Sequence, residues 1–400
     1  MQFKLLQFYK VLSNFSTNLI SGFIPLLIYQ ETQSVYLAVA SLVLGYLFNI
    51  LFNYVLKTLT YRKPELCLCL RILPIISMQI SLLFISKSPI IIMFVLAASY
   101  GLNYTFKNVP SDIIYNYSVP ANTKASTLAL SRAFEQVGYV AAAICGGWFL
   151  DYIPFAYLIS ISLSLYFVSS LPLMILYFKN RNNKNFNAEL VSNAHIHFET
   201  QDSSEEGKMV CNKVRRSYIL YNIFLTGVDA FYMLFGFATY LKTGSFLISG
   251  TLGGACDAIY GIMAVVVGKL DAKKDLTIMS IISSIVISLC IVGATLTMGE
   301  WPSFIFYEII PVFWPFTVIF STQRMFTKSK VLGITNECTF NRYNAQLSGQ
   351  AICYAFGLTG VLWLVFAVGA AFVFTSGVLC PYVEEHTRKT LVDYIEDNES

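Results

Sequence analysis

Long apolar runs constrain this chain more than any other feature of its sequence. Hydrophobic residues make up 56% of the 400 positions, and charged residues only 12%. A helix needs about 20 apolar residues to cross the roughly 30 Å hydrocarbon core of a bilayer. The runs reach that length repeatedly, so the sequence predicts an all-α integral membrane protein whose unit is a bundle of spans.

The apolar runs fall into two groups of six. The first group predicts spans at about residues 7–30, 34–57, 65–86, 89–110, 124–150 and 153–178. The second predicts spans at about 217–241, 244–269, 274–297, 301–323, 336–358 and 361–381. We therefore expect twelve transmembrane helices in two halves, 1–178 and 217–383. Residues 179–216 are too polar to pack a core and predict a linker, and 384–400 predict a tail.

The basic residues are distributed unevenly between the two sides of the predicted bundle. If the N-terminus is cytoplasmic, 21 of the 27 lysines and arginines fall in cytoplasmic segments, and only Lys87 and Lys242 fall outside. Cytoplasmic loops of membrane proteins carry such an excess of positive charge. The distribution predicts an even number of spans, with both termini and the linker in the cytoplasm.

Composition and spacing exclude several other classes. The basic residues form no patch interleaved with aromatics, so we expect no nucleic-acid partner. The nine cysteines lie mostly inside apolar runs, without CxxC or metal-ligand spacing, so we predict no disulfide, metal or cofactor. His195 and His197 lack a third ligand and read as part of a solvated linker.

Short motifs in the loops and spans accompany the predicted order of six spans, a cytoplasmic linker and six more spans. The loop residues that match a G-x3-D-R-x-G-R-K pattern, or its repeat in the second half, are Arg62, Lys63, Gly268, Asp271, Lys273 and Lys274. This organisation resembles the major facilitator superfamily, whose halves are related by an axis along the membrane normal. The resemblance implies a transport protein with a solute site between the halves.

The fifth span resembles an element common in the antiporters of that family. GYVAAAICGGWFLD keeps Gly138, Gly146 and Gly147, whereas Ala142 and Ala143 replace the central Gly-Pro pair. The replacement weakens the inference of antiport that this element would otherwise support, so the mode of coupling stays open. The mixture of aromatic and acidic residues along the spans instead suits export of an amphipathic cation.

Four charged residues fall near the middle of predicted spans. Arg132 and Glu135 lie on the fifth span, Asp229 on the seventh and Asp257 on the eighth. A charge at mid-helix costs at least about 2.5–3.5 kcal/mol, so it is usually functional or paired. Arg132 and Glu135 are either a self-neutralising i,i+3 pair or groups with different partners. Asp229 and Asp257 have no matching base in the second half, and burial would favour their neutral, proton-carrying form.

Further polar residues recur along the spans that line the solute path in the resembled fold. We expect Asn18, Lys107, Glu308 and Asn344 to converge there with the charged residues. The alternative for each amide is an interhelical hydrogen bond that only holds helices together.

A second group of charged residues lies nearer the cytoplasmic ends. Arg71, Asp112, Glu337 and Arg342 are predicted to form a charge network that latches the halves, and the loop residue Asp271 joins this gate group. The alternative is snorkelling of the long side chains to the interface.

These observations predict a secondary active transporter rather than an enzyme, since no nucleotide-binding motif or catalytic histidine constellation is present. We expect proton-coupled movement of a small organic solute and favour export. The alternatives are uptake of an organic anion or zwitterion, or a sensor that binds without transporting. Frequent Asn, Ile, Lys, Phe and Tyr suggest a bacterial cytoplasmic membrane, and we expect a monomer in the lipid bilayer.

Overall fold

The computed structural model describes residues 2–118, 124–181, 205–271, 277–332 and 335–399, which contain helices and no strand. The helices of the first half are α1 (Gln2–Ser21), α2 (Ile24–Thr32), α3 (Val35–Val55), α4 (Lys57–Arg62), α5 (Pro64–Leu70), α6 (Ile72–Leu82), α7 (Pro89–Ser118), α8 (Lys124–Tyr152) and α9 (Phe155–Arg181). Those of the second half are α11 (Glu205–Leu225), α12 (Gly227–Thr243), α13 (Phe246–Asp271), α14 (Thr277–Leu296), α15 (Trp301–Val331), α16 (Thr335–Gly357) and α17 (Leu362–Glu399).

These helices account for all twelve predicted spans, and the all-α membrane fold is confirmed. Ten segments of the described chain are long and apolar enough to cross a membrane. The eleventh predicted span, α16, is not among them, because it contains the polar run NRYNAQLSGQ. Such polarity is expected of a helix that faces a partner or a cavity rather than lipid.

Three predicted spans are each divided into two helices. The first breaks between α1 and α2 at Gly22 and Phe23, with Pro25 in the first turn of α2. The third breaks at Arg71, between α5 and α6. The seventh breaks at Thr226, between α11 and α12, and this break places Asp229 in the first turn of α12. A helix N-terminus carries a partial positive charge that favours a carboxylate.

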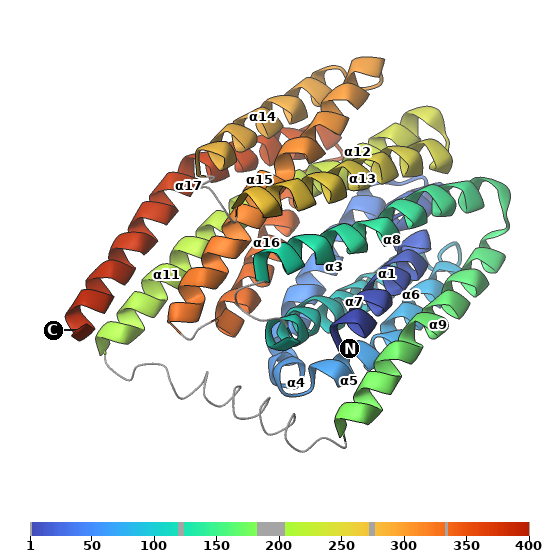
Figure 1. Cartoon of the computed structure of the whole chain (residues 1–400). Helices are drawn as coiled ribbons and strands as arrows, with labels where there is room; N and C mark the ends of the chain where they lie inside the picture. The colour runs from blue at the N-terminus through green and yellow to red at the C-terminus, as the bar shows by residue number, and fades with distance from the viewer. Residues whose placement is uncertain (1, 119–123, 182–204, 272–276, 333–334, 400) are drawn as a thin grey trace.

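Both ends of the described chain lie at the same end of the bundle as the end of α9 and the start of α11 (Figure 1). We call this the linker end and the opposite side the far end. α11 begins at Glu205, twelve residues before the predicted span, and α17 continues to Glu399 through the residues predicted as a tail. The helices therefore extend beyond the apolar runs at the linker end.

The two halves meet along two pairs of helices, α8 with α13 and α3 with α16. Gly250 lies at a close approach of α8 and α13, because a Cβ at this position would collide with the carbonyl oxygen of Ala143. This small residue of α13 thus allows the two halves to pack closely. On the other side of the bundle, the Asn53 amide donates to the Asn344 Oδ1 at 3.0 Å.

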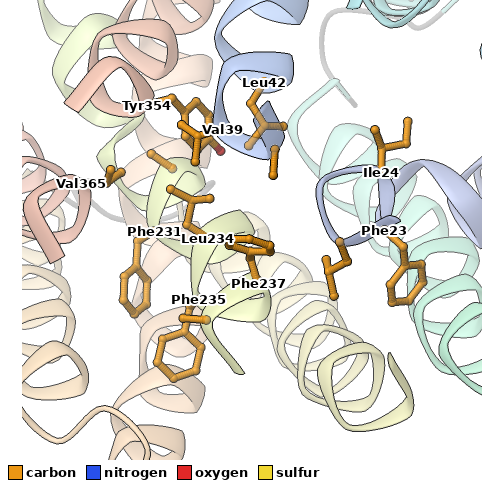
Figure 2. Close-up of a cluster of buried hydrophobic side chains, with 14 of the residues drawn as sticks. Phe23, Ile24, Val39, Leu42, Phe231, Leu234, Phe235, Phe237, Tyr354 and Val365 are labelled. Atoms are coloured by element: carbon orange, nitrogen blue, oxygen red, sulfur yellow. The ribbon is translucent and has the colours of Figure 1, made fainter. Parts of the chain in front are cut away.

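Apolar side chains fill the space between the halves toward the far end. Figure 2 shows Leu234 and Phe237 of α12 near Val39 and Leu42 of α3, with Tyr354 of α16 beside them. All five side chains are buried. Burial of such groups in well-packed contacts stabilises the arrangement of the two halves.

Candidate functional site

A cavity of about 470 Å³ lies between the halves. It is lined from both halves by α1, α2, α3, α7, α8, α12, α13, α15 and α16, and by Gly22 and Phe23 at the break in the first span. Its volume is within the range of small-molecule sites, about 300–1,000 Å³. We call it the central cavity.

Two carboxylates line the central cavity, Asp229 of α12 and Asp257 of α13. Among the described residues that line it there is no lysine, arginine or histidine. Glu308 of α15 is not part of the lining, and neither of its buried carboxylate oxygens has a hydrogen-bond partner in the described chain. The charged side chains among the described residues that line the central cavity are therefore all acidic.

Ten of the residues that line the central cavity are aromatic. Tyr46 stacks on Tyr354 with ring centroids 5.4 Å apart, which joins α3 to α16 across the two halves. Tyr232 stacks on Trp314 at 5.1 Å, within the second half. Ring faces carry partial negative charge and attract cations. The wall thus offers π-faces and hydroxyl groups around the two carboxylates.

The predicted polar residues of the spans separate into lining and non-lining groups. Asn18 lines the central cavity and donates its amide to the Asn14 carbonyl at 2.8 Å. Lys107 does not line it and donates instead to the Tyr139 hydroxyl at 2.7 Å. Asn344 also lies outside the lining and accepts from the other half, as described above.

Glu135, one member of the mid-span pair on α8, has a partner that the sequence did not predict. The Glu135 carboxylate accepts from the Lys10 Nζ of α1 at 2.6 Å, and both side chains are buried. Lys10, which the sequence placed in a cytoplasmic segment, is therefore part of the helix packing. Arg132 belongs to α8, and Asp271 is the last residue of α13, but the side chains of both lie outside the described residues.

The halves are joined by a buried ion pair at the linker end. The Arg342 Nη2 of α16 lies 3.0 Å from the Asp112 Oδ2 of α7, and the Tyr343 hydroxyl donates to the same oxygen at 2.8 Å. Beside them, the Tyr61 hydroxyl donates to the Asn336 carbonyl at 2.9 Å. These contacts, which we call the linker-end latch, join the two halves at this end of the bundle.

The predicted network of four charged residues is corrected by this geometry. Asp112 and Arg342 pair across the halves, whereas Glu337 pairs with Arg215 at 2.9 Å within the second half. Arg71 contacts none of these residues. The sequence suggested one network because the four residues lie at similar depth on their helices. In the structure their side chains lie on helix faces that meet different neighbours.

Asp151 joins the halves at the far end, and sequence reasoning missed it. Its carboxylate, at the end of α8, accepts from the Ser245 hydroxyl at 2.9 Å and from the backbone N–H groups of Phe246 and Leu247 at 3.1 and 2.9 Å. It therefore caps the N-terminus of α13 from the other half. Tyr29 of α2 and Phe237 of α12 also pack edge to face across the halves, with centroids 5.6 Å apart. We call these contacts the far-end latch.

Removing the Asp151 carboxylate is expected to loosen the far end. The residue is exposed, so Asp151→Ala should cost about 1 kcal/mol of the contact between halves, a roughly fivefold rise in the population with a separated far end. Double electron–electron resonance between labels at Gln30 and Thr243, both exposed, measures that population. Glu300→Ala, at another exposed far-end carboxylate, is the control. Equal distance distributions in Asp151→Ala and the control would rule out the latch.

Comparisons with known proteins agree with this arrangement. The family model described as Major Facilitator Superfamily matches residues 8–367. No curated protein matches the chain significantly. The structure is similar to a bacterial homologue of the iron transporter ferroportin in an outward-facing state, with a TM-score of 0.66 and 13% identity over 96% of this chain and all of the other.

Two further solved structures share the architecture. The D-xylose-proton symporter gives a TM-score of 0.67 with 11% identity over 94% of this chain and 95% of the other. The E. coli fucose:proton symporter gives 0.56 with 12% identity over 95% and 98%. Such identities establish the fold, and the family model covers most of the sequence. The chain belongs to the Major Facilitator Superfamily and is a multi-pass membrane transporter.

Proposed function

We propose that the protein exchanges protons for a small organic cation and exports that cation across the cytoplasmic membrane of a bacterium. One observation carries the proposal: the central cavity, about 470 Å³, is lined by Asp229 and Asp257 and by no basic side chain of the described residues. Both termini would then face the cytoplasm, as the distribution of basic residues predicts.

The negative charge of the two aspartates in the lining favours a positively charged solute. A carboxylate in a site of low dielectric constant needs a compensating charge, and an organic cation supplies it while burying its apolar groups. The faces of Tyr232, Trp314 and the other aromatic residues add cation–π attraction. An organic anion would instead be repelled, which makes its uptake the weaker alternative.

Coupling follows if the proton and the cation compete for the same acids. A protonated carboxyl no longer attracts the solute, so binding of one ligand releases the other. With an inward proton gradient, such competition drives the cation outward. Two structural relatives are named as proton symporters, which supports proton coupling in this fold.

The two latches support alternating access about the central cavity. The linker-end latch joins α7 to α16, and the far-end latch joins α8 to α13. Opening one while the other holds would expose the cavity to one side at a time, by rocking of one half against the other.

Binding of a cationic dye tests the proposal. Ethidium should bind the purified protein in nanodiscs, measured by fluorescence anisotropy, with a dissociation constant that rises as the pH falls from 8 to 6. Competition with one proton gives at most about tenfold per pH unit, the limit set by mass action. Asp229→Asn combined with Asp257→Asn should remove both the tight binding and its pH dependence. Equal affinity at both pH values, or in the double variant, would refute the proposal.

A further inference from the structure

Arg71, at the break between α5 and α6, is a buried cation with neutral partners only. It is 1% exposed. Its Nε donates to the Asn103 Oδ1 at 2.6 Å, and its Nη1 donates to the Tyr9 hydroxyl at 3.1 Å and the Ser13 hydroxyl at 3.5 Å. The Tyr166 ring centroid lies 5.7 Å from the guanidinium carbon. No carboxylate of the described chain reaches it.

This environment leaves the charge of Arg71 uncompensated. Arginine stays protonated in proteins, and a buried charge is normally paired or hydrogen-bonded to a charged group. Inside a membrane domain such a charge indicates a functional site. No described residue accepts from its Nη2, so the guanidinium keeps donors for a further ligand.

A second cavity of about 30 Å³ adjoins Arg71 and is also lined by Asn14. Asn14 is completely buried, and neither atom of its amide has a hydrogen-bond partner in the described chain. The space exceeds the roughly 10–15 Å³ that one water requires. It is polar and of a size for a chloride ion or one carboxylate group.

Among the described residues that line this second cavity, three are basic and two are acidic. Lys10, Arg71 and Lys107 line it together with Asp112 and Glu135. The two carboxylates are engaged by Arg342 and Lys10, at 3.0 and 2.6 Å. An anion beside Arg71 would therefore meet a net attraction.

We propose that Arg71 and Asn14 bind a small monovalent anion in the second cavity. The anion is either a dissolved ion such as chloride or the carboxylate of a solute, because Asn108 and Tyr343 line both this cavity and the central one. The site goes beyond the proposed cation exchange and does not depend on it.

Thermal unfolding of the purified protein tests the site. Sodium gluconate is replaced stepwise by sodium chloride or sodium formate at constant ionic strength, and the midpoint is followed by tryptophan fluorescence. The wild-type midpoint should rise and saturate, whereas that of Arg71→Gln should not respond. The control Arg215→Gln removes an arginine that has a carboxylate partner, and it should respond as the wild type does.

A charge-supplying variant keeps the test valid if Arg71→Gln does not fold. Asn103→Asp has the shape of the native side chain and would place a carboxylate on the Arg71 Nε. The native Asn103 Nδ2 has no partner in the described chain, so no hydrogen bond is lost. Asn103→Asp should unfold at a higher temperature in gluconate and lose the response to chloride and formate.

Two matched ligands distinguish the sources of the anion. Glycine betaine carries a carboxylate that tetramethylammonium lacks. A shift with betaine alone, lost in Arg71→Gln, identifies the carboxylate of a solute, whereas shifts with chloride and formate identify a dissolved ion. If neither chloride, formate nor betaine gives a shift that Arg71→Gln or Asn103→Asp abolishes, the site does not exist.

Discussion

Replacing Asp112 with asparagine is expected to destabilise the folded protein by about 3–5 kcal/mol, because it leaves the Arg342 guanidinium buried without its counter-charge. The two residues are 9% and 4% exposed and lie 3.0 Å apart across the halves. Arg342→Gln should have a similar effect, since it leaves the carboxylate unpaired. Detergent-induced unfolding, followed by circular dichroism, measures the free energy of each variant.

A double-mutant cycle separates this interaction from other effects of the substitutions. Asp112→Asn combined with Arg342→Gln should recover more than half of the loss, because no unpaired charge remains. The half-exposed pair Arg215 and Glu337 is the control, and Arg215→Gln should cost less than about 1 kcal/mol. Additive losses in the double variant would show that the linker-end latch is not an ion pair in the membrane.

The span positions could be predicted because the bilayer imposes a fixed length on every apolar run. The breaks could not, since they depend on local backbone geometry; the interruptions at Gly22, Arg71 and Thr226 lie within runs that are continuous in hydropathy. The helical extensions at the linker end were also missed. There the helices continue into polar sequence, where hydropathy gives no signal.

The site residues divide in the same way. Asp229 and Asp257 were placed near the cavity by depth alone, and the cavity includes both. Depth does not reveal which helix face meets which neighbour, so the partner of Glu135, which is Lys10, could not be found. Asp151 was missed because its carboxylate accepts from backbone N–H groups of another helix. Every residue other than proline has such a group, so no sequence pattern indicates the contact.

Replacing the acids of the central cavity is expected to abolish uphill transport. Asparagine has nearly the shape of aspartate but cannot carry a proton, so Asp229→Asn or Asp257→Asn should fold and still mediate counterflow of ethidium. At least one should lower accumulation driven by a pH gradient from tenfold or more to the equilibrium ratio. Accumulation in proteoliposomes with and without the gradient, beside counterflow, measures both activities.

The same experiment identifies the next candidates if the prediction is wrong. Gln346 lines the central cavity and is neutral, so Gln346→Asn is a control for a change of shape without loss of an acid. If both aspartate variants still concentrate ethidium when a pH gradient is imposed, neither residue carries the proton. Glu135 or Glu308 would then be examined.

Proton movement driven by the solute tests proton–cation exchange most directly. Proteoliposomes that contain a pH-sensitive dye are loaded with an organic cation of low permeability, such as tetraethylammonium, and diluted into cation-free buffer of the same pH. Exchange predicts that the lumen acidifies as the cation leaves, and that the combined Asp229→Asn and Asp257→Asn variant gives no pH change. A lumen that becomes alkaline, or that stays at constant pH while the cation leaves, would contradict the account.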